Sequence, residues 1–162
     1  MGEIGRHRTT IRVVFGYLVV QMGVVAAYIL VAPRSFYDNF PEGLGPWVST
    51  LPPYNEHLIR DFGAAGLGLA AVALLAFVWM ERRLVQAAAI GVFLGTLPHA
   101  IYHSTTTEAL STGDNVLNLA GLYAQALLPL LVLYLASGSR QEPGAAPTGP
   151  RWRPRATRQT EA

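Results

Sequence analysis

Four long apolar stretches, each free of acidic residues and arginine, alternate with shorter polar segments along the chain. They cover residues 13–32, 62–80, 84–101 and 116–136. As a helix, each stretch is long enough to cross about 30 Å of hydrocarbon, because an α-helix rises about 1.5 Å per residue. The pattern predicts an all-α integral membrane four-helix bundle, and therefore a multi-pass protein of a cell membrane.

The remaining segments divide the chain around this single domain. Residues 1–12 form a short polar N-terminus, and the transmembrane domain covers residues 13–136. Its longest connection, residues 33–61, is rich in proline and aromatic residues and is predicted to be an outer loop. Residues 137–162 mix Pro, Gly, Ser and Arg with little to bury, which predicts a disordered tail.

The arginines predict the orientation of the bundle. Two of them, Arg34 and Arg60, precede the second span from the side of the long loop. The other ten fall on the opposite side: Arg6, Arg8, Arg12, Arg82, Arg83, Arg140, Arg151, Arg153, Arg155 and Arg158. Because positive residues accumulate in cytoplasmic segments, both termini are predicted to be cytoplasmic, with the loops 33–61 and 102–115 outside.

Composition supports the membrane assignment and narrows the chemistry. Hydrophobic residues make up 51% of the chain and charged residues only 14%, against roughly 25% in soluble domains. The absence of cysteine excludes disulfides, thiolate metal ligands and cysteine nucleophiles. No nucleic-acid-binding module accompanies the arginines. The expected partners are the lipid bilayer and either another membrane protein or a second copy of the chain.

Three of the four histidines fall at the outer ends of the second and third spans. His57 and Asp61 are four residues apart, as are His99 and His103, so each pair shares one face of a helix. Two antiparallel spans joined by a short turn would bring their outer ends side by side. The sequence therefore predicts one cluster of His57, Asp61, His99 and His103 near the outer surface.

Neighbouring residues are candidates to complete this cluster. Glu56 and Arg60 stand beside His57 and Asp61, and Asn115 and Asn118 begin the fourth span at the same membrane level. These four are predicted to act as ligand or hydrogen-bonding groups, because polar side chains at membrane depth need partners.

Small residues predict how the spans pack. Gly91 and Gly95 precede the histidines of the third span, and Gly68 lies in the second. Small residues allow transmembrane helices to approach closely. We therefore expect the second and third spans to form the tightest pair, with Gly68 against Gly91 or Gly95.

Three interpretations of the cluster stay open. Its imidazole and carboxylate groups are typical ligands of a divalent transition metal such as zinc, copper or non-haem iron. Alternatively, they form a hydrogen-bonded network that only stabilises the bundle. In the third interpretation, they line a metal-free pocket that binds a lipid or performs acid–base catalysis. The cofactor, if any, is unknown, and so is whether the protein is an enzyme.

The stretch PPYNEHLIRDFGAAGLGLA, residues 52–70, carries a family resemblance. Its charged helix entrance followed by a Gly/Ala-rich span resembles small actinobacterial four-helix membrane proteins of uncharacterised function and, more distantly, DoxX-like proteins. The resemblance implies a redox-linked membrane subunit, associated with quinone-dependent complexes. It assigns no catalytic residue. The functions to be distinguished are thus a metal-binding or redox-linked subunit, a pocket enzyme or lipid binder, and a structural subunit.

Overall fold

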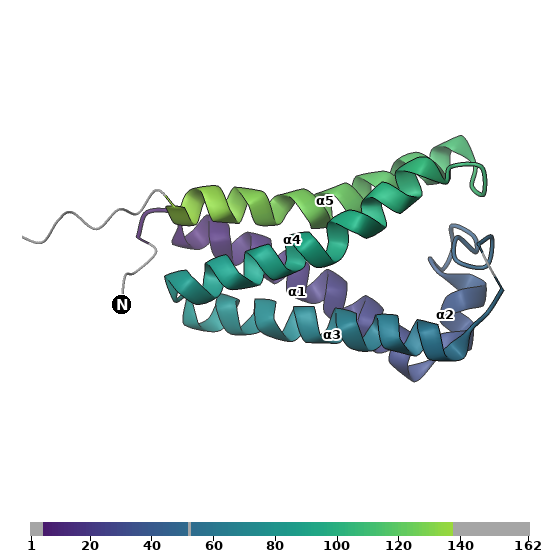
Figure 1. Ribbon diagram of the computed structural model, residues 1–162, viewed down its shortest axis with the longest axis horizontal. Coiled ribbons are helices and arrows are strands. Elements are labelled where there is room, and N and C mark those ends of the chain that lie inside the picture. Colours follow the sequence, from purple (N-terminus) through teal and green to yellow (C-terminus); the bar gives the residue numbers. More distant parts are fainter. Residues whose placement is uncertain (1–4, 52, 138–162) are drawn as a thin grey trace, which may run out of the picture.

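The computed structural model describes residues 5–51 and 53–137 as an all-α protein. The order of its helices is α1 (Arg8–Val31), α2 (Pro33–Asn39), α3 (Glu56–Trp79), α4 (Arg82–Thr105) and α5 (Thr112–Ser137) (Figure 1). Four of them, α1, α3, α4 and α5, are long and apolar enough to cross a membrane. The predicted bundle of four candidate membrane spans is therefore confirmed, and the short helix α2 lies within the predicted outer loop.

The second span begins earlier than its apolar stretch. Asn55 stands at the N-cap of α3, where its side chain accepts a hydrogen bond of 3.1 Å from the backbone N–H of Leu58. This cap satisfies one of the free donors of the first helical turn. Helix α3 therefore starts at Glu56, before its apolar stretch, and includes His57 and Asp61, as predicted from their spacing on one helix face. Its end is marked by Met80, which adopts a left-handed conformation with φ 53°.

The helices pack as two pairs with extensive contacts, α1 with α3 and α4 with α5. The contact between α3 and α4 is less extensive. The prediction that α3 and α4 form the tightest pair is therefore wrong. The reason lies in the glycines: Gly63 of α3 packs on Ile29 of α1, while Gly68 has no neighbour that a side-chain carbon would meet within 4 Å. Gly95 faces the side chain of Leu69 instead of Gly68.

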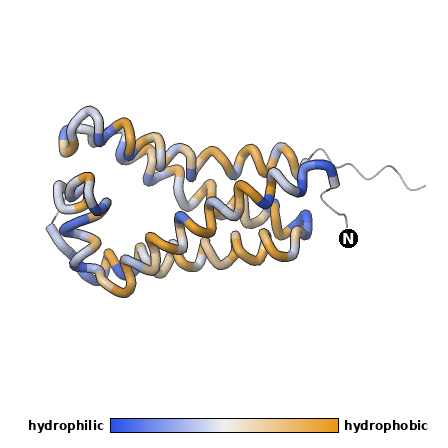
Figure 2. Tube along the Cα trace, turned by 180° about the vertical axis from the view of Figure 1, so that it is seen from behind, coloured by the Kyte–Doolittle hydropathy of each residue, from blue (hydrophilic) through white to orange (hydrophobic). Residues whose placement is uncertain are grey.

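The best-packed part of the bundle lies away from α2. Its largest fully buried side chains come from α1, α4 and α5: Ile11, Phe15, Leu18, Val85, Val92 and Val132. Alanines of α3, including Ala73 and Ala76, complete this core. Figure 2 shows hydrophobic residues along the length of the helices and hydrophilic ones concentrated near the ends, as expected for helices that cross a bilayer.

The beginning of α1 and the end of α5 lie at the same end of the bundle (Figure 1). At this end, Arg82 at the start of α4 donates a hydrogen bond of 3.3 Å to the carbonyl of Ser137. Which side of the membrane this end occupies stays a prediction. The tail predicted to be disordered covers residues 137–162, and residues 138–162 lie outside the described part of the chain.

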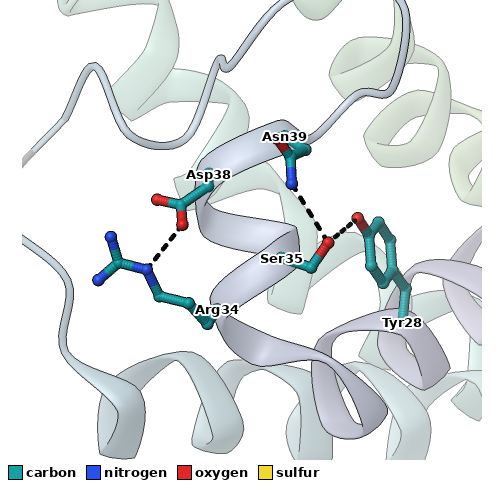
Figure 3. Close-up of polar contacts among 5 residues, drawn as sticks. All are labelled: Tyr28, Arg34, Ser35, Asp38 and Asn39. Carbon is teal, nitrogen blue, oxygen red and sulfur yellow. Dashed lines mark hydrogen bonds and ion pairs between the residues drawn. The ribbon is translucent and has the colours of Figure 1, made fainter.

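Helix α2 is fixed across the opposite end of the bundle. Tyr28 of α1 donates a hydrogen bond of 3.0 Å to Glu42, and its hydroxyl lies 3.0 Å from Ser35 Oγ. Figure 3 shows the contact between Tyr28 and Ser35. It also shows the ion pair within α2 between Arg34 Nε and Asp38 Oδ2, which lie 2.7 Å apart. The contacts of Tyr28 hold α2 and the loop after it against the end of α1, and residues 33–51 form a roof at this end of the bundle.

Candidate functional site

A cavity of about 420 Å³ lies beneath this roof. Its volume falls in the range of about 300–1,000 Å³ that is typical of small-molecule sites. The cavity is lined by residues from all five helices and from the loop after α2: Gln21, Met22, Val25, Ala26, Ile29, Phe36, Phe40, Trp47, Val48, Leu51, Leu58, Ile59, Phe62, Gly66, His99, His103, Asn118, Leu122 and Gln125. Most of the lining is apolar, so the cavity suits a mainly apolar molecule.

The shape of α4 helps to explain why the helices enclose a space here. Pro98 lies inside α4 and has no N–H to donate to the carbonyl of Leu94. Two residues earlier, the hydroxyl of Thr96 donates to the carbonyl of Val92 at 2.8 Å. Both features bend helices. Figure 1 shows α4 bending along its length and, together with α5, diverging from α1 and α3 towards the end where α2 lies.

His99 and His103 stand together on the α4 wall of the cavity. Their ring centroids are 4.7 Å apart, and the ring of His99 also contacts Phe62 of α3 at 5.5 Å. Asn118 of α5 lies beside them, and its Nδ2 donates a hydrogen bond of 3.2 Å to His103 Nδ1. In this arrangement a neutral His103 carries its proton on Nε2 and can donate a hydrogen bond from there.

His57 and Asp61 form a separate pair outside the cavity. His57 Nε2 lies 3.3 Å from Asp61 Oδ2, and their side chains are 87% and 63% exposed. A helix turns about 100° per residue, so these positions point well away from Leu58 and Phe62, which do line the cavity. The four residues predicted as one metal cluster are thus divided between two places. Within residues 5–51 and 53–137, no three His, Asp or Glu residues meet in a geometry that could hold a metal ion.

The other predicted network residues support the backbone around the site. Arg60 pairs with Glu56 at 2.8 Å and donates a hydrogen bond of 2.9 Å to the carbonyl of Leu30, near the end of α1. Asn115 donates to the carbonyls of Thr107 and Leu110 at 2.7 and 3.1 Å, which fixes the connection between α4 and α5. Of the four candidates, only Asn118 lines the cavity.

Two cavity residues absent from the predicted cluster carry buried polar atoms without a partner. Gln21 Oε1 and Trp47 Nε1 are both inaccessible, and neither forms a hydrogen bond within the described part of the chain. Burying such a group unpaired costs roughly 2–7 kcal/mol, depending on the reference state. The amide of Gln21 in an apolar span is the sequence signal that predicts this side chain to point into the bundle. The position of Trp47 follows only from the fold of the loop.

The cavity has two apolar lining residues that keep much of their surface accessible. Leu58 and Phe62 line it and are nevertheless 64% and 48% exposed. Both belong to α3, a candidate membrane span. Phe62 also contacts His99 of α4. These two side chains therefore present apolar surface on a candidate membrane span.

Comparisons of the chain with protein-family models, curated proteins and solved structures found no match. The cavity and the residues that line it are therefore the features from which a function is inferred.

Proposed function

We propose that this small polytopic membrane protein binds a small, mainly apolar molecule in the cavity beneath α2. The observation that carries this proposal is the cavity itself, whose walls combine many apolar side chains with a few polar groups. Such a lining binds a ligand through burial of apolar surface, while the polar groups determine its orientation.

The bilayer is the source of the ligand in this proposal. The exposed side chains of Leu58 and Phe62 provide an apolar route from lipid into the cavity. Phe36, Phe40 and Trp47, from α2 and the loop after it, also line the site. An apolar molecule that partitions into the membrane would thus reach the cavity without crossing water.

This function corresponds to the metal-free, ligand-binding interpretation of the sequence. It needs no contribution from His57 or Asp61, which lie outside the cavity. The redox-linked role implied by the resemblance to DoxX-like proteins stays a prediction. It also stays a prediction that His99 and His103 take part in chemistry on a bound molecule.

Equilibrium dialysis tests the proposal with hexylbenzene as the probe. Protein in lipid nanodiscs is dialysed against empty nanodiscs at equal lipid concentration, so that partitioning into lipid cancels. We expect saturable excess uptake approaching one probe per chain. Replacing Leu122 by Trp fills the cavity and should abolish this uptake. The matched variant Leu127→Trp changes an exposed residue of the same helix and should retain it. Excess uptake that is absent, or equal in both variants, would contradict the proposal.

A further inference from the structure

Accessible polar atoms of the cavity gather on its α4 wall. Asn118 Nδ2 lies 3.2 Å from His103 Nδ1, whereas Nε2 of the same ring has no hydrogen-bond partner among the described residues. Neither ring nitrogen of His99 has a partner within that part of the chain. None of these three unpaired nitrogens is fully buried, and both rings line the cavity. A molecule in the cavity can therefore reach them.

Asn118 determines which nitrogen of His103 carries the proton. Because the Nδ2 group of Asn118 donates, His103 Nδ1 accepts, and a neutral ring then has its N–H at Nε2. Ring contacts with His99 and Tyr102, at centroid distances of 4.7 and 5.5 Å, also hold the imidazole. The cavity thus offers a hydrogen-bond donor whose orientation is fixed before a ligand binds, and this donor requires an acceptor on the ligand.

The walls of the cavity provide no fixed charge for an ionic ligand. Among the described residues that line it, none is Asp, Glu, Lys or Arg. Asp61, next to Phe62 in the sequence, is exposed and pairs with His57 instead. An ammonium group would find no acid here, and a carboxylate would find a positive charge only on a protonated ring. Burying an unpaired charge is far less favourable than burying a hydrogen-bonded neutral group.

The position of His103 places this donor near one end of the cavity. His103 lies two residues before Thr105, the last residue of α4. On α5, the lining continues from Asn118 through Leu122 to Gln125, about 10 Å further along that helix at 1.5 Å per residue. Apart from amides such as that of Gln125, the deeper lining is apolar. It therefore suits the apolar body of a ligand whose polar end lies at His103.

We infer that the ligand is a neutral molecule with a hydrogen-bond-accepting oxygen at one end, bound by the Nε2–H group of His103, and an apolar body. This inference rests on the proposed function and specifies its ligand class and orientation. The oxygen, of a carbonyl or a hydroxyl group, lies at the shallow end of the cavity. The apolar body extends deeper, against side chains such as Met22, Val25 and Leu122.

Three probes of similar size test the inference in the same dialysis experiment. Hexylbenzene has no polar group, para-pentylacetophenone has a ketone oxygen that only accepts, and para-pentylbenzoate is used at a pH at which it is a carboxylate. We expect the ketone to bind about fivefold more tightly than hexylbenzene, the effect of one neutral hydrogen bond. The carboxylate should bind at least about tenfold more weakly than the ketone, because its charge is unpaired in the cavity.

Replacement of single side chains identifies the partner of the ketone. His103→Phe keeps a ring and removes the donor, so it should weaken ketone binding about fivefold relative to hexylbenzene binding. His103→Gln retains a side-chain N–H and should restore part of the affinity. The matched control His57→Phe makes the same replacement at an exposed histidine outside the cavity and should leave ketone binding unchanged. Gln125→Leu tests the deep amide and should have a smaller effect than His103→Phe.

The carbonyl stretching frequency of the bound ketone reports the hydrogen bond directly. An isotope label on the carbonyl carbon separates its infrared band from those of lipid and protein in difference spectra. In the unaltered protein, this frequency should be lower than that of the labelled ketone dissolved in hexane. His103→Phe should return it towards the hexane value. The measurement on the unaltered protein does not depend on whether a variant folds.

The outcomes separate the inference from the proposed function. Equal affinities for the ketone and hexylbenzene, or an unshifted carbonyl band, would overturn the inference and leave the apolar site in place. A shifted band that persists in His103→Phe and is lost in Gln125→Leu would place the oxygen at the deep amide, contrary to the inference. Tighter binding of the carboxylate than of the ketone would overturn the neutrality of the ligand. Absence of saturable uptake for every probe would overturn the proposed function itself.

Discussion

Gly63 of α3 packs so closely on Ile29 of α1 that a methyl group at Gly63 would lie 2.5 Å from Ile29 Cγ2. The same methyl group would lie 3.0 Å from Ile29 Cβ and 3.2 Å from Leu30 Cγ. These atoms belong to a β-branched side chain and to branch points, which have little freedom to move aside. The close contact holds α1 and α3 together beside the cavity, where Ile29 is part of the lining.

Replacing Gly63 by Ala should therefore destabilise the protein by about 1–3 kcal/mol, the usual cost of overpacking. The matched control is Gly68→Ala in the same helix, where an added carbon meets nothing within 4 Å. The control should be neutral or stabilising by up to about 1 kcal/mol, because Ala favours a helix over Gly. Reversible unfolding in mixed lipid–detergent micelles measures both changes. Equal stabilities would contradict the close packing of α1 on α3.

Gly95 provides a second test, at the contact between α4 and α3. A carbon added there would lie 2.8 Å from Leu69 Cδ1, the far end of a flexible side chain, so a small substituent is accommodated by movement of Leu69. A leucine at position 95 is too large for Leu69 to move aside. Gly95→Leu should therefore lower the free energy of unfolding by about 1–3 kcal/mol. Leu94→Ala alters an exposed side chain next to it and should cost less. The unfolding midpoints of the two variants decide the comparison, and the reverse order would contradict this packing.

The proposed entry of the ligand past Leu58 and Phe62 predicts a kinetic effect at Phe62. Its ring lines the cavity, is exposed, and contacts His99 across the boundary between α3 and α4. Phe62→Ala should therefore speed the exchange of bound hexylbenzene several-fold. Leu67→Ala, an exposed residue of α3 that does not line the cavity, should leave the exchange rate unchanged. Exchange measured by stopped-flow mixing of loaded and empty nanodiscs distinguishes the two. An unchanged rate for Phe62→Ala would place the entrance elsewhere.

The orientation of the bundle is testable by reporter fusion. Ten arginines on one side against two on the other predict cytoplasmic termini. A reporter that is active only in the cytoplasm should work after Arg140 and fail when inserted after Gly45. An extracytoplasmic reporter should show the opposite pattern. Activity of the cytoplasmic reporter at Gly45 alone would reverse the predicted orientation.

The sequence by itself determined the number, length and approximate position of the spans. These are local properties, since an apolar stretch of about 20 residues satisfies its own backbone hydrogen bonds as a helix in lipid. Helix periodicity likewise placed His99 and His103 on one face, because positions four apart are neighbours on any α-helix. Their proximity needed no knowledge of the remaining helices.

Only the tertiary structure decided which helices pair and which residues face the cavity. In lipid, the outer face of a helix is as apolar as its inner face, so hydropathy carries little information about rotation around the helix axis. The contact of Gly63 with Ile29 helps to fix that rotation for α3, and it directs Phe62 to the cavity and His57 away from it. Trp47 reaches the site through the fold of the roof. Such placements depend on contacts between segments far apart in the chain, which no local pattern specifies.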